Sequence, residues 1–313
     1  MDDGKLRALL TAVECGSFSK AAAQLGYTQS AMTHLVNKLE AEVGCTLLER
    51  DSQGIRLTDA GKQLLPYIQN VICACDTLLQ EAAEQNDPRT RTLRIGCFAS
   101  IARARLPELL RAFRELHPEI KMDVLVRGDE LPAALASGEI QLALVDEARA
   151  QGFDFLPLAD TPLVAVVPPD FPWEGETIPL ERLLREPFLS SPDQYIEPFL
   201  PPDTPRLEVT ASDDGAILSM VAGGLGVSVL SSFSLVGYEG QVRVLQLEKP
   251  IALRLGAAVK SVNTIGTSAR MFLTFLREYY AKDENWKNFV LHNKGPEAWE
   301  QDKAEREMVL TEF

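Results

Sequence analysis

Residues 17–40 limit what this chain can be more than any other segment. They read SFSKAAAQLGYTQSAMTHLVNKLE, two short helical stretches that meet at Gly26. The first stretch holds closely spaced alanines, and the second, after Thr28, alternates apolar and polar positions with a helical period. Two short helices joined by a tight glycine turn predict a helix-turn-helix, whose second helix lies in the major groove of DNA. We therefore expect double-stranded DNA as a partner.

The second helix predicts which side chains face that groove. Its apolar residues form one face: Met32, Leu35, Val36, Leu39 and Val43. Its polar residues form the other face: Ser30, Thr33, His34 and Asn37. Gln29 and Asn37 can bond adenine N6 and N7, and Thr33 can meet a thymine methyl group or a phosphate.

Other residues are candidates for contacts that fix the position of the protein on the DNA rather than read the base sequence. Lys38, Arg50 and Arg56 carry the charge that phosphates attract. Ser17 and Thr28 are expected first as helix caps and second as phosphate contacts. The alternative interpretation of all these polar side chains is a solvated helix face with no ligand.

Two segments after the helix pair predict a wing and a dimer. Residues 47–50 and 55–57 are apolar runs that flank the turn Asp51-Ser-Gln-Gly54, which indicates a hairpin. This completes a winged helix-turn-helix domain over residues 1–58. Thr58 then caps a helix that runs to about Asn86, and a polar, proline-containing hinge follows to residue 92.

The long helix has a narrow apolar stripe with spacings of three, four and seven. Its members are Leu64, Leu65, Ile68, Val71, Ile72, Cys75, Leu78, Leu79 and Ala82. Such a stripe is typical of a coiled-coil seam, so residues 59–92 are expected to form a homodimer; packing on its own domain is the alternative.

From residue 93 the pattern changes to strands that alternate with helices. This alternation predicts an α/β domain with a mostly parallel sheet over residues 93–282. We expect two lobes with a cleft between them. Lobe I covers about 93–162 and 262–282, and lobe II covers about 163–261, with its first strand starting at Leu163. Residues 283–313 form a charged C-terminal extension.

The ends of the predicted strands supply candidates for a small-molecule site. The first strand ends at Cys97-Phe-Ala-Ser100, where Ser100 can cap the next helix and donate to a ligand. Arg127 and Gly128 form the opposing edge. Equivalent positions in lobe II are Ser190, Ser191 and Ser212. Helix N-termini and Arg127 favour an anionic effector such as a small carboxylate, whereas Asp129, Asp146, Asp213 and Asp214 oppose one.

Composition narrows the function classes. The net charge is −14, and residues 1–92 hold nine Lys and Arg against twelve Asp and Glu, so DNA binding must depend on a few placed cations and on pairing. No apolar run reaches 18 residues and the N-terminus lacks a secretory pattern, so we expect a cytoplasmic protein. Five cysteines without CxxC spacing indicate free thiols. No metal-ligand spacing, cofactor motif or catalytic triad is evident, which argues against an enzyme.

The ordered motifs strongly resemble those of the LysR-type transcriptional regulators. They are GSFSKAAAQL at 16–25, TQS at 28–30, LEAEVG at 39–44, LLER at 47–50, RLTDAG at 56–61 and GLGVSVL at 224–230. The resemblance covers residues 4–282. It implies a winged helix-turn-helix, a dimerising linker helix, and a two-lobed effector domain like a periplasmic binding protein.

The same resemblance bears on individual residues. It implies that Phe98, Ala99, Ser100 and Ile101 line the effector pocket, and that dimers pair into homotetramers. Ser30 stands where the family usually has proline, and His34 where many members have arginine, a stronger partner for phosphate and guanine at neutral pH. Two alternatives stay open: a thiol redox sensor, for which the sensing domain has only Cys97, and a ligand-binding protein without a regulatory role.

Overall fold

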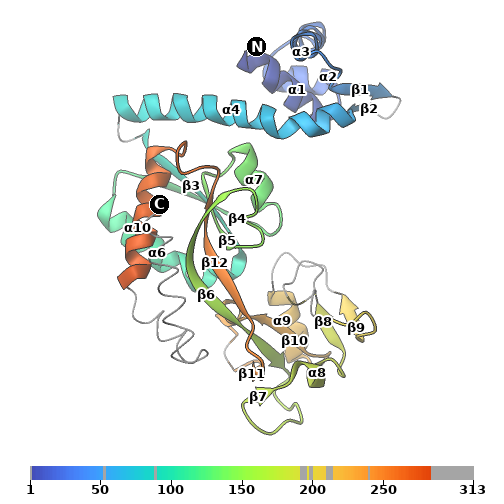
Figure 1. Ribbon diagram of the computed structural model, residues 1–313, viewed down its shortest axis with the longest axis vertical. Coiled ribbons are helices and arrows are strands. Elements are labelled where there is room, and N and C mark those ends of the chain that lie inside the picture. The colour runs from blue at the N-terminus through green and yellow to red at the C-terminus, as the bar shows by residue number, and fades with distance from the viewer. Residues whose placement is uncertain are drawn as a thin grey trace. The chain divides into compact units, whose positions relative to one another are not determined.

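The computed structural model describes residues 2–51, 54–87, 90–190, 196, 200–208, 214–238 and 240–282 (Figure 1). It divides the chain into two compact units. One comprises residues 1–86 with 136–139, and the other comprises the remaining residues. The predicted extension at 283–313 lies outside the described residues. None of the helices in these described ranges is both long and apolar enough to cross a membrane.

The N-terminal unit begins with three helices: α1 (Asp3–Cys15), α2 (Phe18–Leu25) and α3 (Gln29–Val43). Each ends at a glycine with left-handed backbone, and Gly26, at φ 71°, makes the turn between α2 and α3. Only glycine adopts this conformation without steric cost, which is why the chain can turn here. The helix-turn-helix prediction is confirmed.

The hairpin prediction is also confirmed. Strands β1 (Leu48–Asp51) and β2 (Gly54–Leu57) pair antiparallel, with Glu49 opposite Arg56. Buried Leu47, Leu48 and Ile55 join the core of the three helices, so the hairpin is anchored to the helix-turn-helix by packing.

The long helix α4 (Asp59–Asn86) starts as expected, because Thr58 Oγ1 accepts a hydrogen bond of 2.9 Å from the Gly61 amide. The apolar stripe, however, is buried along only part of its length. Ile68 and Ile72 are buried in the core of the N-terminal domain. Leu78 and Leu79 are 69% and 66% exposed. The first pair therefore stabilises its own domain, whereas Leu78 and Leu79 are largely exposed to solvent in the single chain.

The second unit is built on an eight-stranded sheet. Its main order is β4-β3-β5-β12-β6-β11-β7, and β10 pairs with β6. The strands are β3 (Thr92–Cys97), β4 (Lys121–Val126), β5 (Leu142–Asp146), β6 (Asp154–Val167), β7 (Thr177–Ile178), β10 (Ser228–Ser231), β11 (Arg243–Leu247) and β12 (Ala252–Val259).

The sheet is mixed, so the expectation of a mostly parallel sheet was wrong. β3 runs parallel to β4 and β5, whereas β12 is antiparallel to β5 and β6, and β10 and β11 are antiparallel to β6. β6 is one strand of fourteen residues that pairs with β12 at one end and with β10 and β11 at the other. The predicted strand start at Leu163 was therefore also wrong, because residues 154–162 are already extended and paired (Figure 1).

Helices cover the two halves of this sheet. The half that contains β3 to β5 carries α5 (Ala99–Ala104), α6 (Leu106–Leu116), α7 (Leu131–Ser137) and α10 (Thr267–Lys282). The other half carries α8 (Leu180–Leu183) and α9 (Gly215–Ala222), with a small parallel pair, β8 (Phe188–Ser190) and β9 (Arg206–Glu208). The 3₁₀ helix η3 (Ser232–Leu235) contacts both halves, with Phe233 in the core of the first and Leu235 against that of the second. Separate apolar clusters fill the halves, and together they form the expected two-lobed α/β domain.

Candidate nucleic-acid interface and sensing cleft

Helix α3 has one buried face and one exposed polar face. Met32, Val36 and Leu39 are fully buried against α1 and α2. The predicted groove-facing residues Gln29, Ser30, His34, Asn37 and Lys38 are exposed, and Thr33 is half-buried. Val43, expected on the packed face, is instead 38% exposed at the end of the helix. The exposed side presents hydrogen-bonding groups with little charge.

Hydroxyl groups organise the start of α3. Thr28 Oγ1 accepts from the Ala31 amide at 3.2 Å and lies 3.0 Å from Ser30 Oγ, so the predicted cap at Thr28 is confirmed. Ser17 occupies the N-cap position of α2, but its side chain makes no capping hydrogen bond. Ser19, which the sequence analysis did not single out, donates a hydrogen bond of 2.9 Å to Gln29 Oε1. Ser19 lies about two helical turns before Gly26, and no motif in the sequence marks it.

The two arginines of the hairpin are placed differently. Arg50 lies with its guanidinium carbon 4.4 Å from the centre of the Phe18 ring, a cation–π contact between the wing and α2. Arg56 is exposed on β2. An arginine stacked on a ring keeps its planar N–H donors available at the ring's edge, which suits a phosphate contact.

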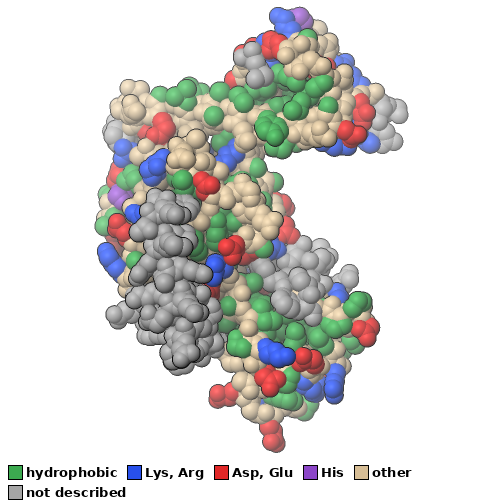
Figure 2. All heavy atoms as spheres, in the orientation of Figure 1, with side chains coloured by type: hydrophobic (Ala, Val, Ile, Leu, Met, Phe, Trp, Pro, Cys, Tyr) green, Lys and Arg blue, Asp and Glu red, His purple; other side chains and the backbone are tan. Residues whose placement is uncertain are grey.

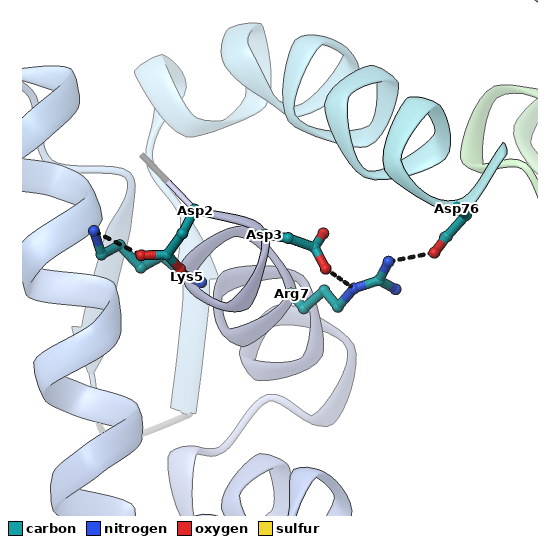
Figure 3. Close-up of polar contacts among 5 residues, drawn as sticks. All are labelled: Asp2, Asp3, Lys5, Arg7 and Asp76. Atoms are coloured by element: carbon teal, nitrogen blue, oxygen red, sulfur yellow. Dashed lines mark hydrogen bonds and ion pairs between the residues drawn. The ribbon is translucent and has the colours of Figure 1, made fainter. Parts of the chain in front are cut away.

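Ion pairs fasten α1 to the helices on either side. Figure 3 shows the contacts of Lys5 with Asp2 and of Arg7 with Asp3 and Asp76. Lys5 Nζ lies 2.6 Å from Glu42 on α3 and 2.9 Å from Asp2. Arg7 pairs with Asp3 at 2.7 Å and with Asp76 on α4. The hydrogen bond to Glu42 raises the pKa of Lys5, and the hydrogen bond from Lys5 lowers the pKa of Glu42. These contacts link the recognition helix to the long helix through α1.

In the sensing domain, the carboxyl ends of β3, β4 and β5 meet at one edge of the sheet. α5 begins at Ala99 with Phe98 at its N-cap, so Ser100 lies inside the first turn and the predicted cap by Ser100 was wrong. Ala99 and Ser100 are half-buried, and Ile101 is 5% exposed in the core of this lobe. Arg127 is exposed beside half-buried Gly128.

Arg149 is the cation at this edge that the sequence analysis missed. Its guanidinium carbon lies 5.2 Å from the centre of the Phe98 ring. Its Nε donates to Asp129 at 2.8 Å, and its Nη1 donates to Asp146 at 3.2 Å. The side chain of Asp146 is 3% exposed, so this pair is largely removed from water. Two aspartates that were expected to oppose an anion are therefore bound to a cation.

Of the lobe II candidates, the structure describes Ser190. Ser190 ends β8 and is 1% exposed. Ser191 and Ser212 lie outside the described residues. Between the lobes, fully buried Thr161 lies 3.3 Å and 3.1 Å from the hydroxyls of Ser231 and Ser232. These hydroxyls join the long strand β6 to the start of η3.

Comparisons with known proteins follow this architecture. Residues 4–62 match the family model described as a bacterial regulatory helix-turn-helix protein of the lysR family, and residues 86–281 match the LysR substrate binding domain. The chain belongs to the LysR family. It is a LysR-type transcriptional regulator with an N-terminal DNA-binding helix-turn-helix and an effector-binding domain. Regulators of this family bind promoter DNA and small-molecule effectors.

Individual relatives agree with this assignment. The chain is 29% identical over 287 residues to the probable HTH-type transcriptional regulator LrrA of Synechococcus elongatus, covering 89% of this chain and 97% of that protein. It is 26% identical to a probable hydrogen peroxide-inducible genes activator of Mycobacterium leprae, covering 90% of this chain and 94% of that protein. The LysR-type regulator CbnR, solved in complex with its target DNA, shares the fold with a TM-score of 0.60 at 20% identity, over 89% of this chain and 99% of that one.

The cysteine of the sensing domain is shielded from solvent. Cys97 is the one cysteine between residues 93 and 282, and it is fully buried in β3. Burial raises its pKa to about 12, so the thiol stays protonated at neutral pH. Because the thiolate is the reactive form, the environment of Cys97 disfavours reaction with peroxide.

Proposed function

We propose that this regulator binds promoter DNA as a homodimer, with α3 of each protomer in a major groove and the β1–β2 wing on the backbone. The observation that carries this is the exposed polar face of α3, opposite a fully buried apolar face. Thr33, His34 and Asn37 then contact base edges, together with Gln29 and Ser30 at the start of the helix. Lys38, Arg50 and Arg56 contact phosphates, joined by Ser17 and Thr28.

The proposal assigns a separate function to each segment of the chain. Residues 1–58 bind DNA, 59–92 dimerise, and 93–282 sense the effector, while dimers pair into homotetramers. Two features support dimeric binding. The α3 face carries few cations, so one domain gains little from phosphate attraction. The exposed apolar side chains of α4 supply a surface for a second copy (Figure 2). Such a regulator acts in the cytoplasm, by binding rather than by catalysis.

The effector site in this proposal lies at the carboxyl ends of β3, β4 and β5. It includes Phe98, Ala99, Ser100, Arg127 and Gly128, with Ile101 behind them and Ser190, Ser191 and Ser212 on the lobe II side. Arg149 supports a small organic acid as the effector, because a ligand carboxylate could replace the exposed carboxylate of Asp129 beside its guanidinium. Asp146 would keep the guanidinium in place.

Genome-wide mapping of bound DNA, followed by gel-shift titration of the recovered sites, tests the DNA-binding proposal. Asn37→Ala is expected to weaken specific binding by about 5- to 150-fold, since a good base contact contributes about 1–3 kcal/mol. Asn37 is exposed, so its substitution leaves the core intact; Glu14→Ala, at an exposed position of α1, is the matched control. Unchanged affinity and base preference in Asn37→Ala would contradict the proposed groove contact.

For the effector, a thermal-shift screen of organic acids and amines separates the two chemical classes. Asp129→Asn is expected to strengthen the response to acids, because it removes the competing carboxylate from Arg149. Stabilisation by amines alone would contradict the organic-acid assignment and leave the DNA-binding proposal untouched.

A further inference from the structure

A small cavity lies between α10, β6 and the loop that joins β12 to α10. Its volume is about 50 Å³, and its apolar lining comes from Leu156, Val262, Ile265 and Leu273. A single water molecule needs about 10–15 Å³ of such space. The α10 cavity therefore has room for a group of several heavy atoms.

The α10 cavity lies away from the proposed effector site. In the pairing of β12 with β5, Ala258 lies opposite Ala143 near the start of β5. Leu255 lies opposite Asp146, where β5 ends. The loop after β12 therefore leaves the sheet at the edge where β5 begins, whereas the effector site is proposed where β3, β4 and β5 end. A molecule in the α10 cavity would be a second ligand.

Two cations of α10 line the same cavity. Arg270 and Arg277 are seven residues apart, so they lie on one face of the helix, with the Thr274 side chain between them. Arg270 Nη2 donates to the carbonyl oxygen of Ile265 at 3.5 Å. Within the part of the chain that the structure describes, neither arginine forms an ion pair. Two like charges at one cavity repel each other, and an anion placed between them removes that repulsion.

Hydrogen bonds hold the loop wall of the cavity in place. Asp154 Oδ2 accepts from the Val262 amide at 2.8 Å, and the Ser261 carbonyl oxygen accepts from the Ile265 amide at 3.1 Å. The carboxylate of Asp154 is thus engaged by the loop backbone. Because the wall is fixed, a ligand does not have to order the loop when it binds.

We infer that the α10 cavity is a second ligand site, which binds a small carboxylate with a short apolar tail. The carboxylate lies between the guanidinium groups of Arg270 and Arg277, whose planar N–H donors match its oxygens. The tail lies against the apolar lining that includes Leu156 and Leu273. An anion without a tail, or a tail without a charge, makes only half of these contacts.

Methyl NMR of the full-length protein, labelled at Ile, Leu and Val, tests this inference. Butyrate is the probe, and inorganic phosphate and butanamide are the comparison ligands that lack the tail or the charge. We expect butyrate to shift the methyl signals of Val262 and Ile265 saturably, and both comparison ligands to bind at least about 10-fold more weakly.

Substitution of either arginine gives a second measurement. Arg270→Gln and Arg277→Gln are each expected to weaken butyrate binding by about 10-fold, the lower end for hydrogen bonds to charged groups, because Arg270 is exposed to water. Arg111→Gln, at an exposed position of α6, is the matched control and should leave the titration unchanged.

Three outcomes would overturn the inference. Butyrate could leave Val262 and Ile265 unshifted, phosphate or butanamide could bind as tightly as butyrate, or both arginine variants could bind butyrate like the wild type. The methyl signal of Ile101, at the proposed effector edge, reports on that site separately. Shifts at Ile101 alone would refute the second site and support the first, so the failures of the two proposals are distinguishable.

Discussion

Truncating the exposed leucines of α4 is expected to separate the protomers without unfolding the DNA-binding domain. Leu78 and Leu79 expose 69% and 66% of their surface, whereas Ile68 and Ile72 on the same helix are buried within the N-terminal domain. Leucine to alanine removes three carbon groups, each contributing about 0.8 kcal/mol when fully buried. Scaled by exposure, each side chain contributes at most about 1.6 kcal/mol to an interface.

A symmetric dimer contains four such side chains, so the Leu78→Ala/Leu79→Ala variant loses up to about 6 kcal/mol of association free energy, or about four orders of magnitude in Kd. Sedimentation equilibrium over a range of protein concentrations measures this change, and circular dichroism checks that α4 remains helical. Lys62→Ala/Asn70→Ala, at exposed polar positions of α4, is the matched control. A double-leucine variant that dimerises as tightly as the wild type would refute the reasoning.

Three further outcomes are expected. Hydrogen bonding to Lys5 lowers the pKa of Glu42, so this pair stabilises the folded state at pH values above the usual Glu pKa of 4.5. The stabilisation is lost as the pH falls through the lowered pKa. Urea unfolding at several pH values should therefore show that the stability of Lys5→Met depends less on acid than that of the wild type. Cys97, with its pKa of about 12, should resist iodoacetamide at pH 8 in the native protein, and modification detected by mass spectrometry before unfolding would contradict its burial. A Cβ at Gly61 would lie 2.3 Å from the Leu47 carbonyl oxygen, so Gly61→Ala should destabilise the N-terminal domain by about 1–3 kcal/mol in thermal unfolding; an unchanged melting temperature would show that the backbone relaxes freely.

The DNA-binding half could be predicted closely from the sequence because its signals are local. Gly26 and Thr28 mark the turn and the start of α3, and Thr58 marks the start of α4. Each of these features depends on hydrogen bonds within a few residues, so the sequence contains all of the interacting groups. The division of the α4 stripe did not follow from the same pattern, since periodicity does not say which of two partners covers an apolar face.

For the sensing half, the fold class was predicted correctly, but the predicted direction of strand pairing was wrong. Alternating strands and helices indicated an α/β domain, but β6 and β12 pair antiparallel over residues far apart in the chain. At the cleft, Ser100 lies within α5 rather than at its cap, and Arg149 reaches Asp129 and Asp146 from beyond β5. Asp146 and Arg149 are only three residues apart, but Asp129 follows β4 and meets Arg149 only because β3 aligns the ends of β4 and β5 in one sheet.

The sequence by itself determined the helix-turn-helix, the wing and the long helix, because each depends on contacts between neighbours along the chain. The order and spacing of its motifs determined the family. The tertiary structure alone decided three things: which apolar residues of α4 stay exposed, which cation stands at the sensing edge, and that α10, β6 and the loop after β12 enclose one cavity. Each arises from groups on different elements whose distance is set by packing rather than by sequence separation. That is why the partner class could be predicted from the sequence, while the chemistry of recognition required the fold.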